Sequence, residues 1–227
     1  MTEPHPLDRP VWNALHAGWA DRLDRAGRAV RLAPEYGPFA AAPDMLPDTL
    51  RDLATLVDAG EEAWLVEKNE PPANLGDLKI LRSAVCVQMW APSIDATPPA
   101  FDIVELGEAD AGAMRALADL TKPGPFRRLT HRLGRFVGVR DAGQLVAMAG
   151  ERMRLDGYVE VSGVCTHPAH RGRGYAGGLM RQVAGRILAE GETPFLHAYD
   201  HNAGALALYE TLGFRRRATF SLTVVTR

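Results

Sequence analysis

The sequence of 227 residues has little cysteine, no long apolar run and almost no net charge. Its two cysteines, Cys86 and Cys165, allow at most one disulfide, which excludes a small scaffold held together by disulfides. No apolar run approaches the roughly 18 residues that a membrane-spanning helix needs. The formal net charge is -2, so the chain lacks the positive field that general binding to nucleic acid or to an anionic membrane requires.

Three motifs of common enzyme classes are also missing. The sequence has no G-x-S-x-G, no G-x-x-x-x-G-K-[ST] and no H-E-x-x-H, which argues against a nucleophile elbow, a P-loop and a zinc-protease helix. The first ten residues have neither the basic nor the apolar segment of a signal peptide. We therefore expect a cytoplasmic protein without membrane association. Apolar residues make up 46% and charged residues 24%, which is typical of a globular protein.

Two segments have the composition of linkers, rich in proline and small polar residues. They are residues 67–77 and residues 91–100, and strand-like sequence begins again at Phe101. We predict a domain boundary near residue 100, which divides the chain into an N-terminal α+β domain (1–100) and a second domain (101–227).

Apolar spacing predicts the elements of both parts. In the first part, we expect two helices and two strands, at 10–23, 45–60, 62–67 and 78–90. In the second part, we expect helices at 108–120, 126–133, 175–190 and 202–213. The strands of that part are expected at 101–106, within a hairpin over 134–153, within 157–168 where Pro168 ends the strand, and at 193–199 and 217–225.

A glycine-rich loop precedes the helix at 175–190, and its letters fit two phosphate-binding motifs. Gly172, Gly174 and Gly177 form G-x-G-x-x-G, a dinucleotide fingerprint, and Asp200 follows at the end of the next strand. A dinucleotide fold needs several further strand–helix units, whereas only one helix and one strand follow Asp200. The order of elements therefore disfavours a dinucleotide-dependent oxidoreductase.

The second motif is R-x-x-G-x-A, formed by Arg171, Gly174 and Ala176. One helix and one strand later, the chain reads N-x-x-A-x-x-L-Y-E-x-x-G-F, filled by Asn202, Ala205, Leu208, Tyr209, Glu210, Gly213 and Phe214. With both motifs in this order, the sequence resembles the GNAT superfamily of acyl-CoA-dependent N-acyltransferases over roughly residues 101–227. The resemblance implies an α/β (α+β) fold: a mixed, mostly antiparallel, splayed sheet flanked by helices, with the N-terminal α+β domain added.

The resemblance also implies the donor, acetyl-CoA, and the residues that hold it, with no metal. The pantetheine arm would pair with a strand edge, and the pyrophosphate would lie on backbone N–H groups at the start of the following helix. The residues implied are Val164, Cys165, Thr166, Arg171, Gly172, Arg173, Gly174, Tyr175, Ala176, Gly177, Asn202 and Tyr209. Asn202 has the alternative role of capping its own helix.

Two catalytic roles follow from the same resemblance. Tyr209 is expected to be the acid that protonates the departing CoA thiolate. Glu160 matches the position of a general-base glutamate, with Glu151 as the second candidate and a chain of waters as the third. The resemblance implies that the acceptor is a primary amine of a small molecule or a peptide. Phe126, Arg127 and Arg128 are candidate contacts for this acceptor.

Other interpretations stay open at this stage. Residues 1–100 are compatible with a degenerate half-copy of the same fold, a lid, or a dimerisation element that would make the protein a homodimer. A fold that binds acyl-CoA without transferring the acyl group is the main alternative function. Cys165, His167 and His170 have a spacing compatible with metal binding, but no fourth ligand lies nearby in the sequence.

Overall fold

A computed structural model of the protein describes residues 5–95 and 97–227. Its larger sheet has eight strands in the order β4-β11-β5-β10-β9-β8-β7-β6. These strands are β4 (Ala63–Glu67), β5 (Lys79–Trp90), β6 (Val104–Leu106), β7 (Phe136–Asp141), β8 (Gln144–Leu155), β9 (Tyr158–Thr166), β10 (Thr193–Tyr199) and β11 (Arg215–Thr226). Only the pair β9 and β10 is parallel among these neighbours. The predicted mixed, mostly antiparallel sheet is confirmed.

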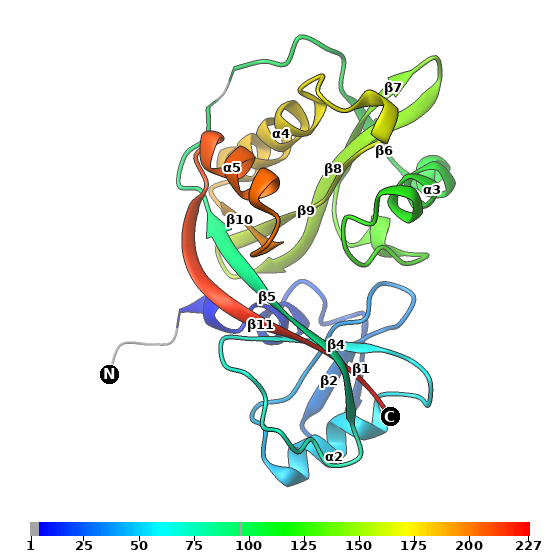
Figure 1. The fold of residues 1–227 in the computed structure, drawn as a ribbon, viewed down its shortest axis with the longest axis vertical. Coiled ribbons are helices and arrows are strands. Elements are labelled where there is room, and N and C mark those ends of the chain that lie inside the picture. The colour runs from blue at the N-terminus through cyan, green and yellow to red at the C-terminus, as the bar shows by residue number, and fades with distance from the viewer. Residues whose placement is uncertain (1–4, 96) are drawn as a thin grey trace.

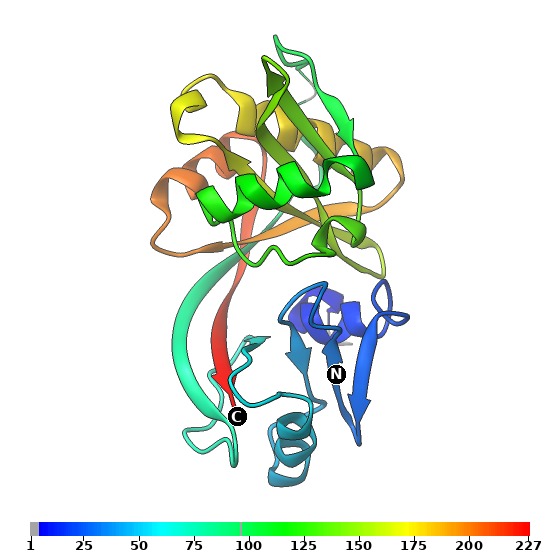
Figure 2. The same cartoon turned by 90° about the vertical axis from the view of Figure 1, so that its right-hand side faces the viewer.

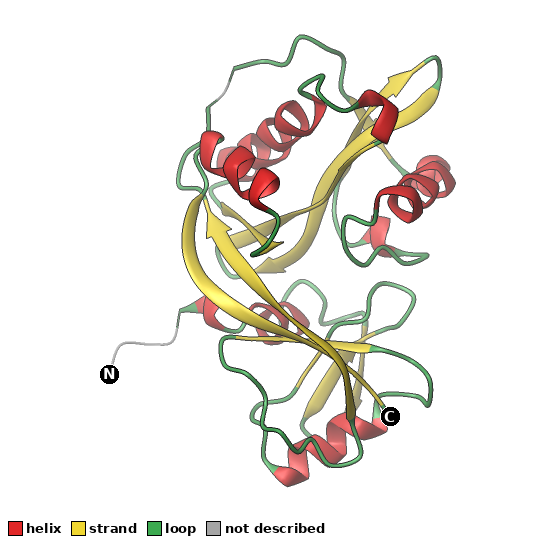
Figure 3. Ribbon diagram, viewed as in Figure 1, coloured by secondary structure: helices red, strands yellow, loops and turns green. Residues whose placement is uncertain are grey.

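Helices cover both faces of this sheet (Figure 3). They are α3 (Ala111–Thr121), α4 (Tyr175–Ala189) and α5 (Ala203–Thr211). Alternate residues of β8 belong to different cores: Ala147 packs with α4, and Met148 packs with α3. Successive strand residues point to opposite faces, so α3 lies on one face and α4 on the other.

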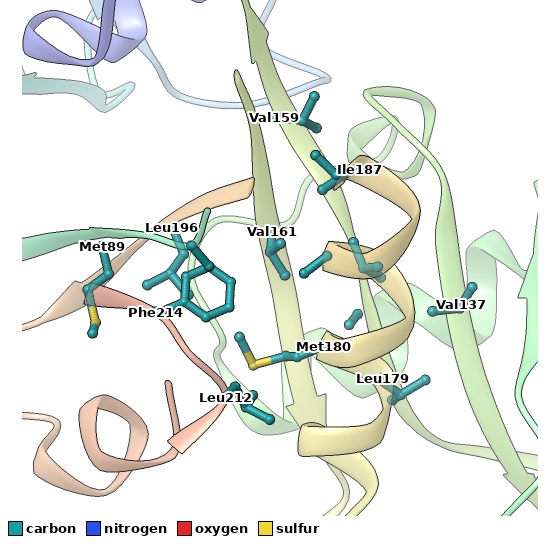
Figure 4. Packing of buried hydrophobic residues seen from close by; sticks show 14 of the residues in the cluster. Met89, Val137, Val159, Val161, Leu179, Met180, Ile187, Leu196, Leu212 and Phe214 are labelled. Atoms are coloured by element: carbon teal, nitrogen blue, oxygen red, sulfur yellow. The ribbon is translucent and has the colours of Figure 1, made fainter. Parts of the chain in front are cut away.

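The helix α4 forms as its apolar pattern predicts. Leu179, Met180 and Ile187, which belong to its two rows of apolar residues, are fully buried. Figure 4 shows them packed against Val159 and Val161 of β9. This packing fixes the start of α4 next to the end of β9, where the glycine-rich loop lies.

The parallel pair β9 and β10 separates soon after it begins. Pairing covers only Tyr158–Glu160 with Thr193–Phe195, after which the two strands diverge. A bulge in β9 adds to this divergence, because Gly163 and Val164 lie opposite a single residue of β8. Gly163 has φ +64°, and a Cβ atom there would come within 2.9 Å of a Phe136 ring atom. The predicted splay of the sheet is thus built into β9.

The N-terminal residues form a lower part beneath these helices (Figure 1). It contains α1 (Pro10–Leu15), a small sheet of β1 (Leu23–Ala26), β2 (Ala29–Leu32) and β3 (Ala40–Ala41), and α2 (Pro47–Thr55). The long strands β5 and β11 run through both the upper and the lower part (Figures 1 and 2).

The larger sheet crosses the predicted boundary near residue 100. The strand β5 belongs to the first hundred residues, yet it lies between β10 and β11. It pairs with β11 along its whole length, from Lys79 to Trp90. A boundary at residue 100 therefore does not divide the sheet, because β4 and β5 precede this residue and pair with β10 and β11, which follow it.

Three predicted helices are much shorter than expected, and one of them, expected at 45–60, spans only Pro47–Thr55. The first of the three ends at Leu15, because the chain turns there to bring Gly18 against β8, where its N–H donates to the Arg154 carbonyl at 3.1 Å. The short helix expected at 126–133 is only a 3-10 turn, Thr130–Arg132. The Thr130 hydroxyl instead donates to the Tyr36 carbonyl at 2.6 Å, which ties this loop to the lower part.

Candidate active site

A groove of about 790 Å³ lies where β9 ends, between the start of α4 and α5. Every residue that the sequence comparison linked to acetyl-CoA lines this groove: Val164, Cys165, Thr166, Arg171, Gly172, Arg173, Gly174, Tyr175, Ala176, Gly177, Asn202 and Tyr209. Two motifs that are separate in the sequence therefore lie on one surface.

The start of α4 has the properties of an anion-binding site. Gly172 and Gly174 both have φ +77°, and a Cβ atom at either would meet nothing within 4 Å. The first hydrogen bond of the helix runs from Gly178 N–H to Gly174 C=O, so the N–H groups of 175–177 find no backbone acceptor among the described residues. These groups and the helix dipole favour a phosphate at this point.

Two arginines of the loop add positive charge. Arg173 lies with its Nη1 3.6 Å from a carboxylate oxygen of Asp141. Arg171 has no ion-pair partner within the described part of the chain. Arg171 is therefore the guanidinium that is free to meet an anion in the groove.

The strand edge expected to receive the pantetheine arm is open. Val164–Thr166 lies beyond the three paired residues of β9 and β10, so this edge has no strand beside it on the β10 side. The Thr166 hydroxyl is buried without a hydrogen-bond partner among the described residues. Burial raises the pKa of the Cys165 thiol to about 11, so this thiol stays protonated and does not serve as a nucleophile.

Asn202 and Tyr209 lie where the groove meets a second cavity, since both residues line both spaces. The Asn202 side chain accepts a hydrogen bond from the Ala205 N–H at 3.2 Å, so it caps α5 as the alternative reading proposed. The Tyr209 hydroxyl makes no hydrogen bond to the described residues, and burial raises its pKa above the usual value of 10.0. Tyr209 is therefore a protonated phenol with a free hydroxyl.

The second cavity, of about 180 Å³, lies between the upper and lower parts of the molecule. Phe39, Trp64 and Val66 of the N-terminal residues form one wall of it. Strand residues of the upper part, His197 among them, form another wall. The first hundred residues thus contribute side chains directly to the site.

The loop after α3 closes this cavity with different residues from those predicted. Residues 122–125 line it, whereas Phe126, Arg127 and Arg128 do not. Phe126 packs its ring edge against Phe136, and Arg127 lines a neighbouring open cavity of about 370 Å³. The arginine that faces the predicted acceptor position is Arg152 of β8.

Glu160 lies behind the second cavity and does not line it. Its carboxylate accepts hydrogen bonds from Arg152 Nε at 2.7 Å and Nη2 at 2.8 Å, and from His197 Nδ1 at 2.9 Å. Burial opposes ionisation, but the Arg152 charge and the hydrogen bonds outweigh it and hold the pKa of Glu160 at about 2. So weak a base does not favour the predicted general-base role, which stays a prediction.

Glu151, the second candidate for the general base, is also buried and paired with arginine. Its carboxylate pairs with Arg135, Arg154 and Arg186 at 2.9 to 3.2 Å. Glu151 lines neither the groove nor the second cavity.

A hydrogen-bond chain fixes the tautomer of His197. Gln88 accepts from Arg217 Nη1 through its side-chain oxygen at 2.9 Å, which orients the amide. The Gln88 Nε2 group then donates to the Leu7 carbonyl and to His197 Nε2, at 3.0 and 3.1 Å. His197 therefore accepts at Nε2 and donates from Nδ1 to Glu160, so both ring nitrogens are engaged.

Comparison with known proteins decides the family. The model of the FR47-like protein family matches residues 136–222. A solved structure from Novosphingobium aromaticivorans, described as an acetyltransferase of the GNAT family, is 47% identical, with a TM-score of 0.88 and 99% of both chains covered. This chain belongs to the GNAT family of acetyltransferases. A comparison with curated proteins gives no match.

Other members share the GNAT fold at lower identity. A GCN5-related N-acetyltransferase from Kribbella flavida is 22% identical, with a TM-score of 0.65 over 95% of this chain and 94% of its own. A GCN5-related N-acetyltransferase-like protein from Streptococcus suis is 20% identical, with the same TM-score over 99% and 94%. These likenesses support the fold, and the sequence-based resemblance to GNAT enzymes is confirmed.

Two residues that line the second cavity, Arg152 and His197, were not predicted from the sequence. His197 is a polar residue in a largely apolar strand, which is a signal for a buried polar contact, whereas Arg152 stands among other charged residues of β8, Glu151 and Arg154, and gives no such signal. The sequence does not indicate which residue contacts Arg152 and His197, because Glu160 meets both side chains only through the pairing of β8, β9 and β10.

Across residues 5–95 and 97–227, no group of three His, Cys, Asp or Glu side chains is arranged to hold a metal ion. None of the helices in the same residues combines the length and apolar character needed to cross a bilayer.

Proposed function

We propose that this protein transfers an acetyl group from acetyl-CoA to a primary amine, by direct attack while both substrates are bound. The observation that carries the proposal is the junction at Tyr209. There, a groove with unpaired N–H groups and an open strand edge meets a second, partly apolar cavity. A donor in the groove and an acceptor in the cavity would meet beside the Tyr209 hydroxyl.

The residues of the groove fit the chemistry of acetyl-CoA. The N–H groups of Arg171–Gly177, with the Arg171 side chain, would bind the diphosphate. The open edge at Val164–Thr166 would pair with the amides of the pantetheine arm as an added strand does. Glycine at 172 and 174 leaves the backbone accessible, because a side chain at either position would project into this space.

The transfer forms a C–N bond to the acceptor and breaks the C–S bond of the thioester. Tyr209 donates its hydroxyl proton to the departing thiolate and regains a proton from solvent. The amine loses one proton, which we assign to solvent water because none of the described residues that line the second cavity carries a carboxylate. The products are the N-acetylated amine and CoA with a free thiol, and no acyl-enzyme is formed.

The test measures thiol release from acetyl-CoA with and without a panel of amines, and acetyl-CoA binding by calorimetry in parallel. We expect thiol release that depends on added amine. Binding of acetyl-CoA without amine-dependent release by any member of the panel would instead identify a non-catalytic acyl-CoA-binding protein. Absence of acetyl-CoA binding would refute both.

A further inference from the structure

We infer that the acceptor is a small amino carboxylate, such as a free amino acid with an apolar side chain, whose carboxylate pairs with Arg152. This inference rests on the proposed function and specifies its acceptor. It follows from the charge, the geometry and the apolar walls of the second cavity.

The second cavity is lined by positively charged side chains. Arg152 and Lys122 line it, and no aspartate or glutamate lines it among the described residues. A polyamine or a lysine-rich peptide brings further ammonium groups, and no carboxylate lines the cavity among the described residues to receive them. An acceptor with a carboxylate brings the opposite charge and is favoured.

The geometry of Arg152 prepares it to bind an anion. Its Nε and Nη2 atoms are engaged by Glu160, and its guanidinium lies over the Phe39 ring, 4.8 Å from the centroid. Nη1 makes no hydrogen bond within the described part of the chain. The guanidinium is therefore held in one orientation with one nitrogen available, so little side-chain freedom remains to be lost on binding.

The remaining walls favour an apolar side chain. Phe39 and Trp64 meet edge to face, with ring centroids 6.2 Å apart, and Tyr199 lines the same space. Val66, Leu196 and Leu222 complete the apolar surface. A volume of about 180 Å³ suits a molecule the size of an amino acid.

One of these charges also assists the reaction. A cation near an ammonium group lowers its pKa, because like charges disfavour the charged form. Lys122 would thus promote the neutral, nucleophilic amine, whereas the charge of Arg152 is already balanced by Glu160.

The experiment compares free L-leucine, L-phenylalanine and L-methionine with their C-terminal amides, at saturating acetyl-CoA. Spermidine and a lysine-containing peptide with blocked ends complete the panel. A charge-assisted hydrogen bond corresponds to a preference of roughly 10- to 100-fold in kcat/KM. We expect the free amino acids to exceed their amides by this factor, and to exceed both polycations.

A paired variant tests the residue itself. Arg152→Gln with Glu160→Gln removes both charges, so no buried charge is left without a partner. We expect the ratio of kcat/KM for acid over amide to fall to about one. The control is Arg132→Gln with Glu108→Gln, an exposed pair with the same two-bond geometry, which should keep the wild-type ratio.

The outcomes separate this inference from the proposed function. Acetyl-CoA binding together with equal use of acids and amides, preference for a polycation, or no use of the amino acids would overturn the inference and leave the donor site intact. Loss of acetyl-CoA binding by the folded wild type would instead overturn the proposed function. If the paired variant does not fold, the wild-type ratio of kcat/KM for acid over amide still tests the inference.

Discussion

Arg152 of β8 and Glu160 of β9 form a two-bond ion pair behind the second cavity, with both hydrogen bonds at 2.7 to 2.8 Å. The Glu160 side chain is only 1% exposed and that of Arg152 is 13% exposed. Glu108 makes the same contacts with Arg132 and a histidine on the surface, where its side chain is 65% exposed. The chain thus contains a buried and an exposed version of one arrangement.

The first prediction concerns stability. Replacing Glu160 by Gln leaves the Arg152 charge without its partner inside the protein. We expect Glu160→Gln to lower the free energy of unfolding by about 3 kcal/mol, as for a broken buried ion pair. Urea denaturation measures this change. Glu108→Gln is the control and should have little effect; equal effects of the two variants would contradict the account.

The second prediction concerns acid. The pKa of Glu160 falls from an ordinary value of 4.5 to about 2 on folding, so its contribution is complete above pH 4.5 and is lost as the pH falls toward 2. This difference corresponds to about 3 kcal/mol of stability. The difference in free energy of unfolding between wild type and Glu160→Gln should therefore become smaller when urea denaturation is repeated from pH 6 down to pH 3. A difference that stays constant over this range would rule out the low pKa of Glu160.

The third prediction concerns the acid catalyst. Tyr209→Phe removes only a hydroxyl that has no partner among the described residues, so the fold should not change. We expect kcat to fall by about 100-fold, while the Kd for acetyl-CoA stays within a few-fold of wild type. Thiol release and calorimetry measure the two quantities. Tyr36→Phe, at a residue that lines neither cavity, serves as the control, and an unchanged kcat in Tyr209→Phe would remove Tyr209 from the mechanism.

The fourth prediction concerns alkaline pH. Burial raises the pKa of Tyr209 above 10.0, so the phenol keeps its proton to a higher pH than an exposed tyrosine does. We expect kcat to stay level up to about pH 10 and to decline only above it. A decline in kcat centred below pH 9 would assign the acid to another group.

The groove at the start of α4 was predictable from the sequence because its residues lie in short, local motifs. Arg171, Gly174 and Ala176 are close neighbours in one loop, and the glycine conformations there follow from local backbone preference. The N-cap at Asn202 and the turn at Gly213 are local features too, and both are present. Such features need no knowledge of which strands pair.

The second cavity was not predictable for the opposite reason. Phe39, Trp64, Arg152 and His197 are far apart in the sequence and meet only because β5 fills the place between β10 and β11. The pairing partner of β5 lies more than a hundred residues later, and the proline-rich segment after Trp90 resembles a domain linker. Local composition therefore suggested a boundary where long-range pairing continues.

The central claim is that the start of α4 binds the diphosphate of acetyl-CoA, and calorimetry on two glycine variants tests it most directly. Gly174 and Gly191 stand at opposite ends of α4 with φ of +77° and +80°, and a Cβ atom at either meets nothing within 4 Å. Tryptophan at either position therefore introduces a similar backbone strain, but only at 174 does it enter the groove. We predict micromolar binding of acetyl-CoA by wild type and Gly191→Trp, and none by Gly174→Trp. Equal binding by both variants, or no binding by wild type, would contradict the account.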